Sequence, residues 1–374
     1  MELRGVIEMA LTAGIVGLPN VGKSTLFNAI TNAQVEAANY PFATIDPNVG
    51  VVEVPDHRLE SLTKIFNPKK TIATTFEFTD IAGLVKGASR GEGLGNKFLA
   101  NIRETDAICE VVRCFRDKDI THVDGDVNPT RDVETINLEL IFADLETVEK
   151  RIGKLEKKAK SGDKEAKAEM AVLTPLKETL EAGKPARIIE FSQEELVFVR
   201  QYTLLTMKPL IYVANLGEED LENPDANPYY VELKEYAAKE GCDVVPICAK
   251  IESELVGLDK EEKDMFMQDL GIEESGLDKL IKEAYSLLGL NTFFTVGADE
   301  VRAWTFKNGM LAPEMAGIIH TDFQKGFIKA ETYSYDDLIQ YGSELALREA
   351  GKIRQEGKQY VGKDGDIMFF KFNV

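Results

Sequence analysis

A phosphate-loop motif near the N-terminus constrains this chain more than any other feature. Residues 17–24 read Gly-Leu-Pro-Asn-Val-Gly-Lys-Ser and match G-x-x-x-x-G-K-S. Its two glycines permit a turn whose N–H groups converge on phosphate, at the positive end of the helix that follows. Lys23 is expected to reach the β/γ oxygens, and Ser24 to ligate Mg²⁺. The motif predicts nucleotide contacts by Asn20, Val21, Gly22, Lys23, Ser24 and Thr25, after a strand at residues 11–16.

Length and composition limit the other possibilities. A chain of 374 residues is too long for one ordinary core, so two or three domains are expected. No apolar run reaches the length of a membrane span, and four cysteines without a C-x-x-C pair favour reduced thiols in the cytoplasm. The net charge of −20 disfavours non-specific wrapping of nucleic acid, and no sequence-specific DNA partner is expected. Residues 1–8 are interpreted as an extension that the fold does not use.

The order of apolar segments predicts a parallel α/β domain interrupted by helices. Strand candidates lie at 49–54, 74–79, 107–115 and 209–215, and residues 244–250 read as a further strand and loop. Between them, Leu145, Val148, Ile152 and Leu155 form a heptad stripe, and a second stripe follows the break at residues 161–163. We expect an antiparallel two-helix hairpin that projects from the domain. Two ordinary surface helices packed on the sheet are the alternative.

Three regions follow from this pattern. Residues 11–127 and 205–288 are predicted to form the nucleotide-binding domain, with residues 128–204 as a helical insertion. Short strands with one helix predict a small α+β module at residues 289–372.

Two further segments fit a triphosphate site. Asp80-Ile81-Ala82-Gly83 follows a predicted strand, so Asp80 can hold Mg²⁺ through water and the Gly83 amide can meet the γ-phosphate. Thr44 is predicted to complete Mg²⁺ coordination when its loop closes, although its hydroxyl could instead stabilise a turn.

The segment Asn215-Leu216-Gly217-Glu218 indicates which nucleotide base the site would select. GTPases that carry N-K-x-D use one aspartate to accept both N1–H and the N2 amine of guanine. Here the lysine is replaced by Leu216, and the carboxylate of Glu218 is one methylene longer. Asn215 and nearby backbone groups can serve the N6 amine of adenine, while Leu216 packs on the ring. The segment therefore favours adenine.

Hydrolysis needs a group that orients water. Leu84 follows Gly83 where many GTPases carry glutamine, and leucine cannot hydrogen-bond to water. His122 lies in a loop before the helical insertion and can orient water near neutral pH. The alternative is a surface-loop histidine. Turnover is expected to be slow.

Together, residues 17–24, 40–47, 80–88 and 215–218 and the C-terminal module resemble the YchF/Obg-like ATPase family, within the Obg branch of translation-factor-related P-loop proteins. The resemblance runs from about residue 11 to residue 374. It implies a P-loop α/β domain, a coiled-coil-like helical arm and a C-terminal TGS domain with a β-grasp fold.

The resemblance also implies function. It implies ATP preferred over GTP, a K⁺ ligand at Asn20 and a hydrolytic role for His122. Cys248-Ala249-Lys250 departs from the usual S-A-K base loop by a thiol. The family is associated with binding to the ribosome, through its large subunit or as a whole, and with translational and stress regulation. A GTPase of the Obg type, and a ribosome-binding scaffold with incidental turnover, are the alternative interpretations.

Overall fold

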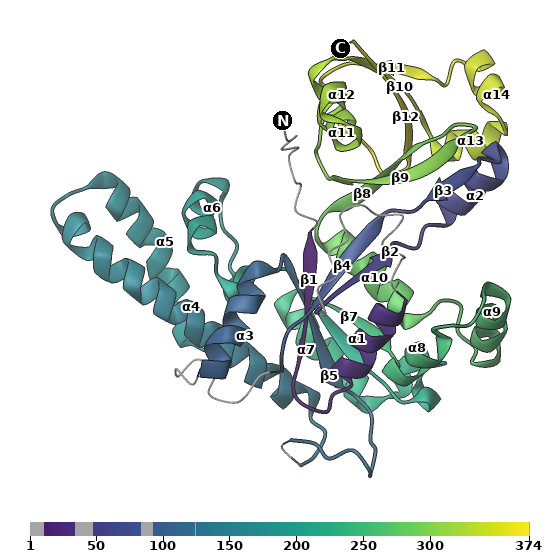
Figure 1. Cartoon of the computed structure of the whole chain (residues 1–374). Coiled ribbons are helices and arrows are strands. Elements are labelled where there is room, and N and C mark those ends of the chain that lie inside the picture. The colour runs from purple at the N-terminus through teal and green to yellow at the C-terminus, as the bar shows by residue number, and fades with distance from the viewer. Residues whose placement is uncertain (1–10, 34–47, 84–92, 124, 374) are drawn as a thin grey trace. The chain divides into compact units, whose positions relative to one another are not determined.

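A computed structural model describes residues 11–33, 48–83, 93–123 and 125–373 (Figure 1). The chain divides into two compact units. The first contains Leu11–Val51 and Glu77–Leu280, and the second contains Val52–Phe76 and Ile281–Val374. No helix in the described part of the chain has the length and apolar character needed to cross a membrane.

The first unit is built on a sheet with strand order β2-β4-β1-β5-β6-β7. The strands are β1 (Thr12–Gly17), β2 (Val49–Glu53), β4 (Thr75–Asp80), β5 (Ala107–Arg113), β6 (Leu210–Asn215) and β7 (Asp243–Ile247). β1 pairs in parallel with β4 and β5, and the parallel pairing continues through β6 to β7. The predicted parallel α/β fold is confirmed.

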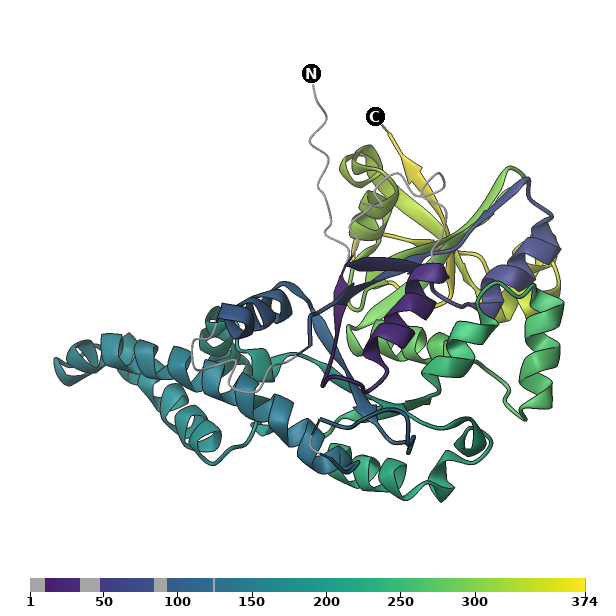
Figure 2. The same ribbon diagram turned by 60° about the horizontal axis from the view of Figure 1, so that its bottom comes forward.

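Helices cover both faces of this sheet, with α3, α4 and α7 on one side and α1 and α8 on the other (Figures 1 and 2). The helices of this part of the chain are α1 (Lys23–Asn32), α3 (Gly93–Glu104), α4 (Pro129–Lys160), α5 (Lys164–Glu181), α6 (Gln193–Val199), α7 (Pro228–Glu240), α8 (Ala249–Leu255), α9 (Lys260–Asp269) and α10 (Gly276–Leu287). All residues of β5 and β6 are buried, as expected for central strands covered on both faces. Because β4, β1, β5, β6 and β7 run in parallel, their carboxyl ends lie along one edge of the sheet.

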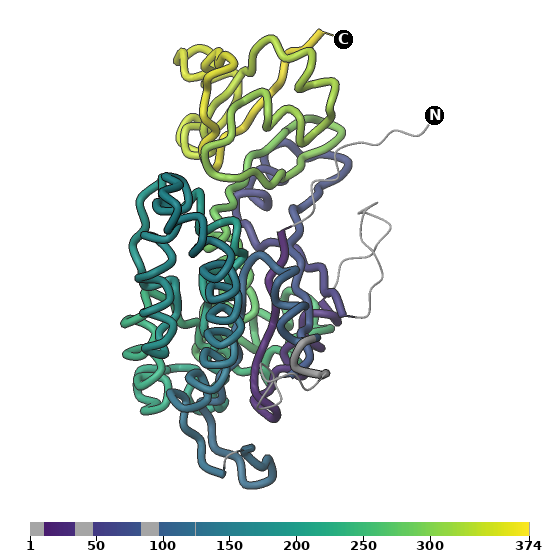
Figure 3. The backbone as a smooth tube through the Cα atoms, turned by 90° about the vertical axis from the view of Figure 1, so that its left-hand side faces the viewer, coloured from purple at the N-terminus to yellow at the C-terminus, as the bar shows by residue number. Residues whose placement is uncertain are grey.

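α4 and α5 form the predicted antiparallel hairpin, which projects from the sheet as a helical arm (Figures 1 and 3). α4 has 32 residues and is capped at its start by Asn128, whose side chain accepts from the N–H of Arg131. At 1.5 Å per residue the helix is about 48 Å long. Both apolar stripes meet in one core, which contains Val148, Leu155, Ala166, Val172, Leu173 and Leu176, with Leu145, Ile152 and Met170 packed against it.

The second unit contains a sheet with order β11-β10-β12-β8-β9-β3. Its elements are α2 (His57–Phe66), β3 (Lys70–Ile72), β8 (Leu290–Thr295), β9 (Glu300–Lys307), α11 (Ala312–Ile319), α12 (Thr321–Lys325), β10 (Phe327–Ser334), α13 (Tyr335–Tyr341), α14 (Glu344–Glu349), β11 (Arg354–Glu356) and β12 (Asp366–Phe372). β12 pairs in parallel with β8 at the centre, between two antiparallel pairs. This arrangement is the expected β-grasp fold, but residues 289–372 contain four helices, α11 to α14, where the sequence pattern predicts one.

One boundary differs from the sequence prediction. The sequence pattern places residues 52–76 in the nucleotide-binding domain, but they belong to the second unit. Leu59 and Leu62 of α2 share a core with Phe294 and Ile367, and Arg58 forms an ion pair of 2.6 Å with Asp364. The apolar spacing of α2 predicts a buried face but says nothing of which sheet buries it.

Candidate functional site

The phosphate loop connects β1 to α1 and has the expected backbone. Gly22 precedes α1 with φ of 94°, in the left-handed region that favours glycine. A Cβ on Gly22 would meet the amide nitrogen of Asn215 at 2.1 Å. The N-cap residue of α1 is Gly22, which has no side chain to accept from the first N–H groups of the helix. A negatively charged phosphate is the natural partner of such a terminus.

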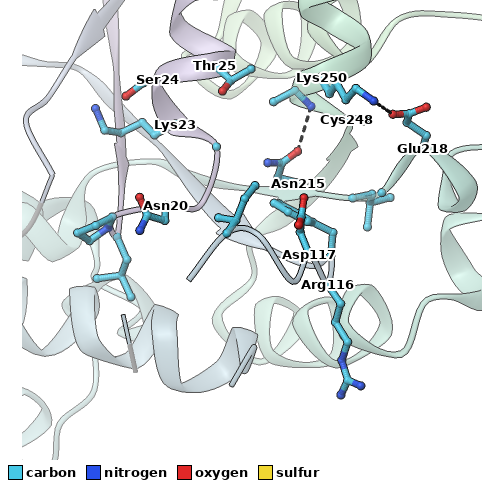
Figure 4. A pocket seen from close by; sticks show the side chains of 18 of the residues that line it. Asn20, Lys23, Ser24, Thr25, Arg116, Asp117, Asn215, Glu218, Cys248 and Lys250 are labelled. Atoms are coloured by element: carbon cyan, nitrogen blue, oxygen red, sulfur yellow. Dashed lines mark hydrogen bonds and ion pairs between the residues drawn. The ribbon is translucent and has the colours of Figure 1, made fainter. Parts of the chain in front are cut away.

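A cavity of about 870 Å³ opens beside this loop (Figure 4). It is lined by Leu18, Pro19, Asn20, Gly22, Lys23, Ser24, Thr25, Gly83, Phe115, Arg116, Asp117, Ile120, Asn215, Leu216, Gly217, Glu218, Glu219, Cys248, Ala249 and Lys250. The structure thus brings together most of the residues that the sequence predicted around a nucleotide. Val21 is an exception: it is buried, it is absent from the described residues that line the cavity, and its backbone carbonyl accepts from the side-chain amide of Asn215.

Lys23 and Asp80 meet at the phosphate side of the site, where the Lys23 ammonium forms an ion pair with the Asp80 carboxylate. Asp80 ends β4, and its N–H donates to the carbonyl of Asn48 at 2.8 Å. Ser24 lies next to Lys23 on the cavity wall. A hydroxyl and a partly exposed carboxylate are hard oxygen donors, so the donor set fits Mg²⁺.

Asn215 has a role that the sequence did not predict. Its side-chain amide donates to the carbonyl of Val21 at 2.8 Å, and its side-chain oxygen accepts from the N–H of Ala249 at 3.0 Å. Because Asn215 is buried at the end of β6, it connects the phosphate loop to the loop after β7. The residue therefore positions both sides of the cavity.

The far end of the cavity combines an ion pair with apolar surface. The Lys250 ammonium pairs with the carboxylate of Glu218 (Figure 4). Leu216 is buried, and its N–H donates to the carbonyl of Ile247 at 2.8 Å. Cys248 is buried there too, and burial raises the pKa of its thiol. A buried thiol thus stands where the S-A-K loop implied by the family resemblance carries a hydroxyl.

The segment after β5 supplies a wall that the sequence analysis missed. Arg113 ends β5 with only 1% of its surface exposed, and its guanidinium donates to the carbonyls of Phe115 and Ile120. The following side chains line the cavity, and Arg116 also lies over the ring of Tyr229. The only signal in the sequence was an arginine at the end of an otherwise apolar strand.

His122 lies at the end of that segment, in a buried pair. Its Nε2 is 2.8 Å from a carboxylate oxygen of Asp132 at the start of α4, and both side chains are at most 4% exposed. Burial raises the pKa of Asp132. The neighbouring carbonyl of Thr121 accepts from the side chain of Asn20 at 3.1 Å. The described residues that line the cavity include Asn20 but not His122, so its role in orienting water stays a prediction.

Two predicted residues cannot be placed. Thr44 and Leu84 lie outside the described residues, so the expected Mg²⁺ contact of Thr44 and the position of Leu84 stay predictions as well. Gly83 is described and lines the cavity beside the phosphate loop.

A parallel α/β sheet with this loop and cavity defines a P-loop nucleotide-binding domain. A family model described as 50S ribosome-binding GTPase matches residues 12–172. A second model, YchF-GTPase_C, described as a protein of unknown function, matches residues 290–373.

Comparison with whole proteins identifies the family. The chain is 63% identical over 366 residues to the ribosome-binding ATPase YchF of Bacillus subtilis, across 98% of this chain and 100% of the relative. It is 57% identical, with the same coverage, to the ribosome-binding ATPase YchF of Escherichia coli O157:H7. The solved structure of the Schizosaccharomyces pombe YchF GTPase superposes with a TM-score of 0.87 at 42% identity, covering 97% of this chain and 98% of that one. The chain therefore belongs to the YchF family.

Proposed function

We propose that this chain is a cytoplasmic, Mg²⁺-dependent ATPase that binds the ribosome and changes its affinity for it with nucleotide state. The observation that carries the proposal is the single cavity shared by the phosphate loop and the Asn215–Glu218 segment. The names of the full-length relatives, ribosome-binding ATPase YchF, support both the reaction and the partner.

The residues in and around the cavity would have different roles, according to their chemistry. Lys23 and the N–H groups at the start of α1 would neutralise charge on the phosphates, and the Gly83 amide would contact the γ-phosphate. Ser24 and Thr44 would hold Mg²⁺, with Asp80 acting through water. When bound, this ion would neutralise negative charge on the phosphates. Asn20 would serve a K⁺ ion, and His122 would orient water after leaving its pair with Asp132.

The assignment of regions belongs to the same proposal. The nucleotide domain would comprise residues 11–127 and 205–288, less the segment that joins the second unit. The helical insertion, residues 128–204, and the C-terminal domain, residues 289–372, would offer surfaces to the ribosome. Regulation of translation or of a stress response would follow from nucleotide-dependent binding.

A GTPase is the second candidate, because both matching family models and the fission-yeast structure carry that word in their names or descriptions. Competition against a fluorescent nucleotide separates the two candidates. We expect ATP to displace the label at lower concentration than GTP, and equal or better displacement by GTP would reject the assignment to ATP.

Sedimentation with purified ribosomes tests whether ribosome binding depends on the bound nucleotide. The full chain is incubated with ribosomes and ATP, ADP or no nucleotide, and the pelleted fraction is measured. We expect the fraction to differ between ATP and ADP. A Lys23→Met variant, which should bind the phosphates weakly, serves as control and should lose that difference. Identical pelleting of the wild type in all three states would favour a scaffold with incidental turnover.

A further inference from the structure

The ion pair between Lys250 and Glu218 lies at the end of the cavity where the proposed function would place the base, and both residues line that cavity (Figure 4). Glu218 follows β6 and Lys250 stands in the first turn of α8, so the pair joins two loops that converge on this end. We propose that Lys250 is a positioning residue for base selection, which keeps the Glu218 carboxylate from serving guanine. The inference rests on the proposed nucleotide site.

The argument starts from the edges of the two bases. Guanine presents N1–H and an N2 amine side by side, so an aligned carboxylate can accept both hydrogen bonds. Adenine has a bare N1 acceptor at the same place, and a carboxylate facing it would be repelled. When the Lys250 ammonium engages the Glu218 carboxylate, guanine therefore loses an acceptor that adenine could not have used.

Local charge explains why one lysine has this influence. The segment that begins at Glu218 continues Glu219-Asp220-Leu221-Glu222, so four carboxylates lie within five residues. Lys250 is the cation that the structure pairs with Glu218, and this contact raises the pKa of Lys250. The Glu219 carboxylate instead folds against Gly217, where a Cβ would meet its oxygens at 2.8 Å.

A hydrogen bond independent of the ion pair also holds together the two loops that carry Glu218 and Lys250. Asn215 accepts from the N–H of Ala249, the residue immediately before Lys250. The backbone of the two loops is thus held without the ion pair, and removing the Lys250 ammonium should release the Glu218 side chain rather than the loop. The expected change is in base preference and not in the shape of the cavity.

The test is a comparison of base preference in three full-length variants. Dissociation constants for ATP, ADP, GTP and GDP are measured by competition for the wild type, Lys250→Met and Lys250→Arg. Since the pair is exposed and screened, we expect Lys250→Met to lower the GTP-to-ATP ratio of dissociation constants about threefold to fivefold. Lys250→Arg retains the pair and should keep the wild-type ratio.

A double variant shows whether the effect passes through Glu218. Adding Glu218→Gln to Lys250→Met removes the freed carboxylate and should abolish the gain for guanine nucleotides. If the wild type prefers ATP and Lys250→Met leaves the ratio unchanged, the role of Lys250 is rejected while the proposed ATPase function stands. A wild type that prefers GTP would instead overturn the assignment to ATP. A gain that persists in the double variant would also reject a role for Glu218.

Discussion

The side-chain amide of Asn215 donates to the backbone carbonyl of Val21 at 2.8 Å. This bond joins the end of β6 to the phosphate loop, two segments that are 194 positions apart in the chain. The same side chain accepts from Ala249 and so reaches the third loop of the cavity. One buried residue therefore sets the distance between the phosphate and base ends of the site.

Asn215→Ala should weaken nucleotide binding by at least about tenfold, because it leaves the buried Val21 carbonyl and Ala249 N–H without this partner. Titration calorimetry with ATP and ADP measures the loss. Asn227→Ala is a suitable control, because Asn227 is another buried asparagine that caps α7 and is absent from the described lining of the cavity. Equal effects of the two substitutions would contradict a specific role for Asn215.

His122→Ala should lower the single-turnover rate of ATP hydrolysis by about 100-fold, as expected for loss of a group that positions water. ATP affinity and thermal unfolding are measured in parallel, because Asp132 would be left buried without this partner. His320→Ala, at an exposed histidine of the C-terminal unit, should hydrolyse like the wild type. A normal rate for His122→Ala would show that the residue only shapes the loop.

The buried carboxylate of Glu252 predicts a pH dependence of stability. It accepts from the N–H of Gly276 at 2.8 Å, and burial raises its pKa to about 7 from 4.5. A raised folded-state pKa means that stabilisation is complete below the unfolded pKa and is lost as the pH rises to about 7. From pH 5 to pH 8 the wild type should lose roughly 2–3 kcal/mol through this group.

Glu252→Gln should remove that loss, because the amide oxygen can still accept while no charge forms. Urea unfolding measures the free energy of unfolding of the variant and the wild type at pH 5 and pH 8. Relative to the wild type, the variant should be more stable at pH 8 than it is at pH 5. A shift of the opposite sign would show that folding lowers the pKa of Glu252 instead of raising it.

Asp144→Ala should cost about 3 kcal/mol of folding stability. Its buried carboxylate accepts from the N–H groups of Leu205 and Thr206 at 2.8 Å and from the Thr206 hydroxyl at 2.7 Å. These bonds attach the chain that returns from the arm to α4. Glu146→Ala, at an exposed i,i+4 pair on the same helix, should change stability by less than about 0.5 kcal/mol. Chemical denaturation measures both, and comparable losses would contradict the prediction.

The sequence by itself determined the features that depend on local spacing. The phosphate loop needs fixed residues at fixed intervals, and the apolar stripes of α4 and α5 repeat with the period of a helix. The C-terminal module likewise showed its short strands, whereas its β-grasp fold was implied by the family resemblance and is confirmed. For the phosphate loop, the helical stripes and the short strands, the chemistry of neighbouring residues was enough.

Only the tertiary structure decided which distant residues act together. The role of Asn215, the support of the cavity wall by Arg113 and the burial of His122 against Asp132 depend on contacts between segments that the sequence pattern does not connect. The same holds for α2, whose apolar face could have served either sheet. Local periodicity states that a face will be buried, but the partner that buries it is selected by the packing of the whole chain.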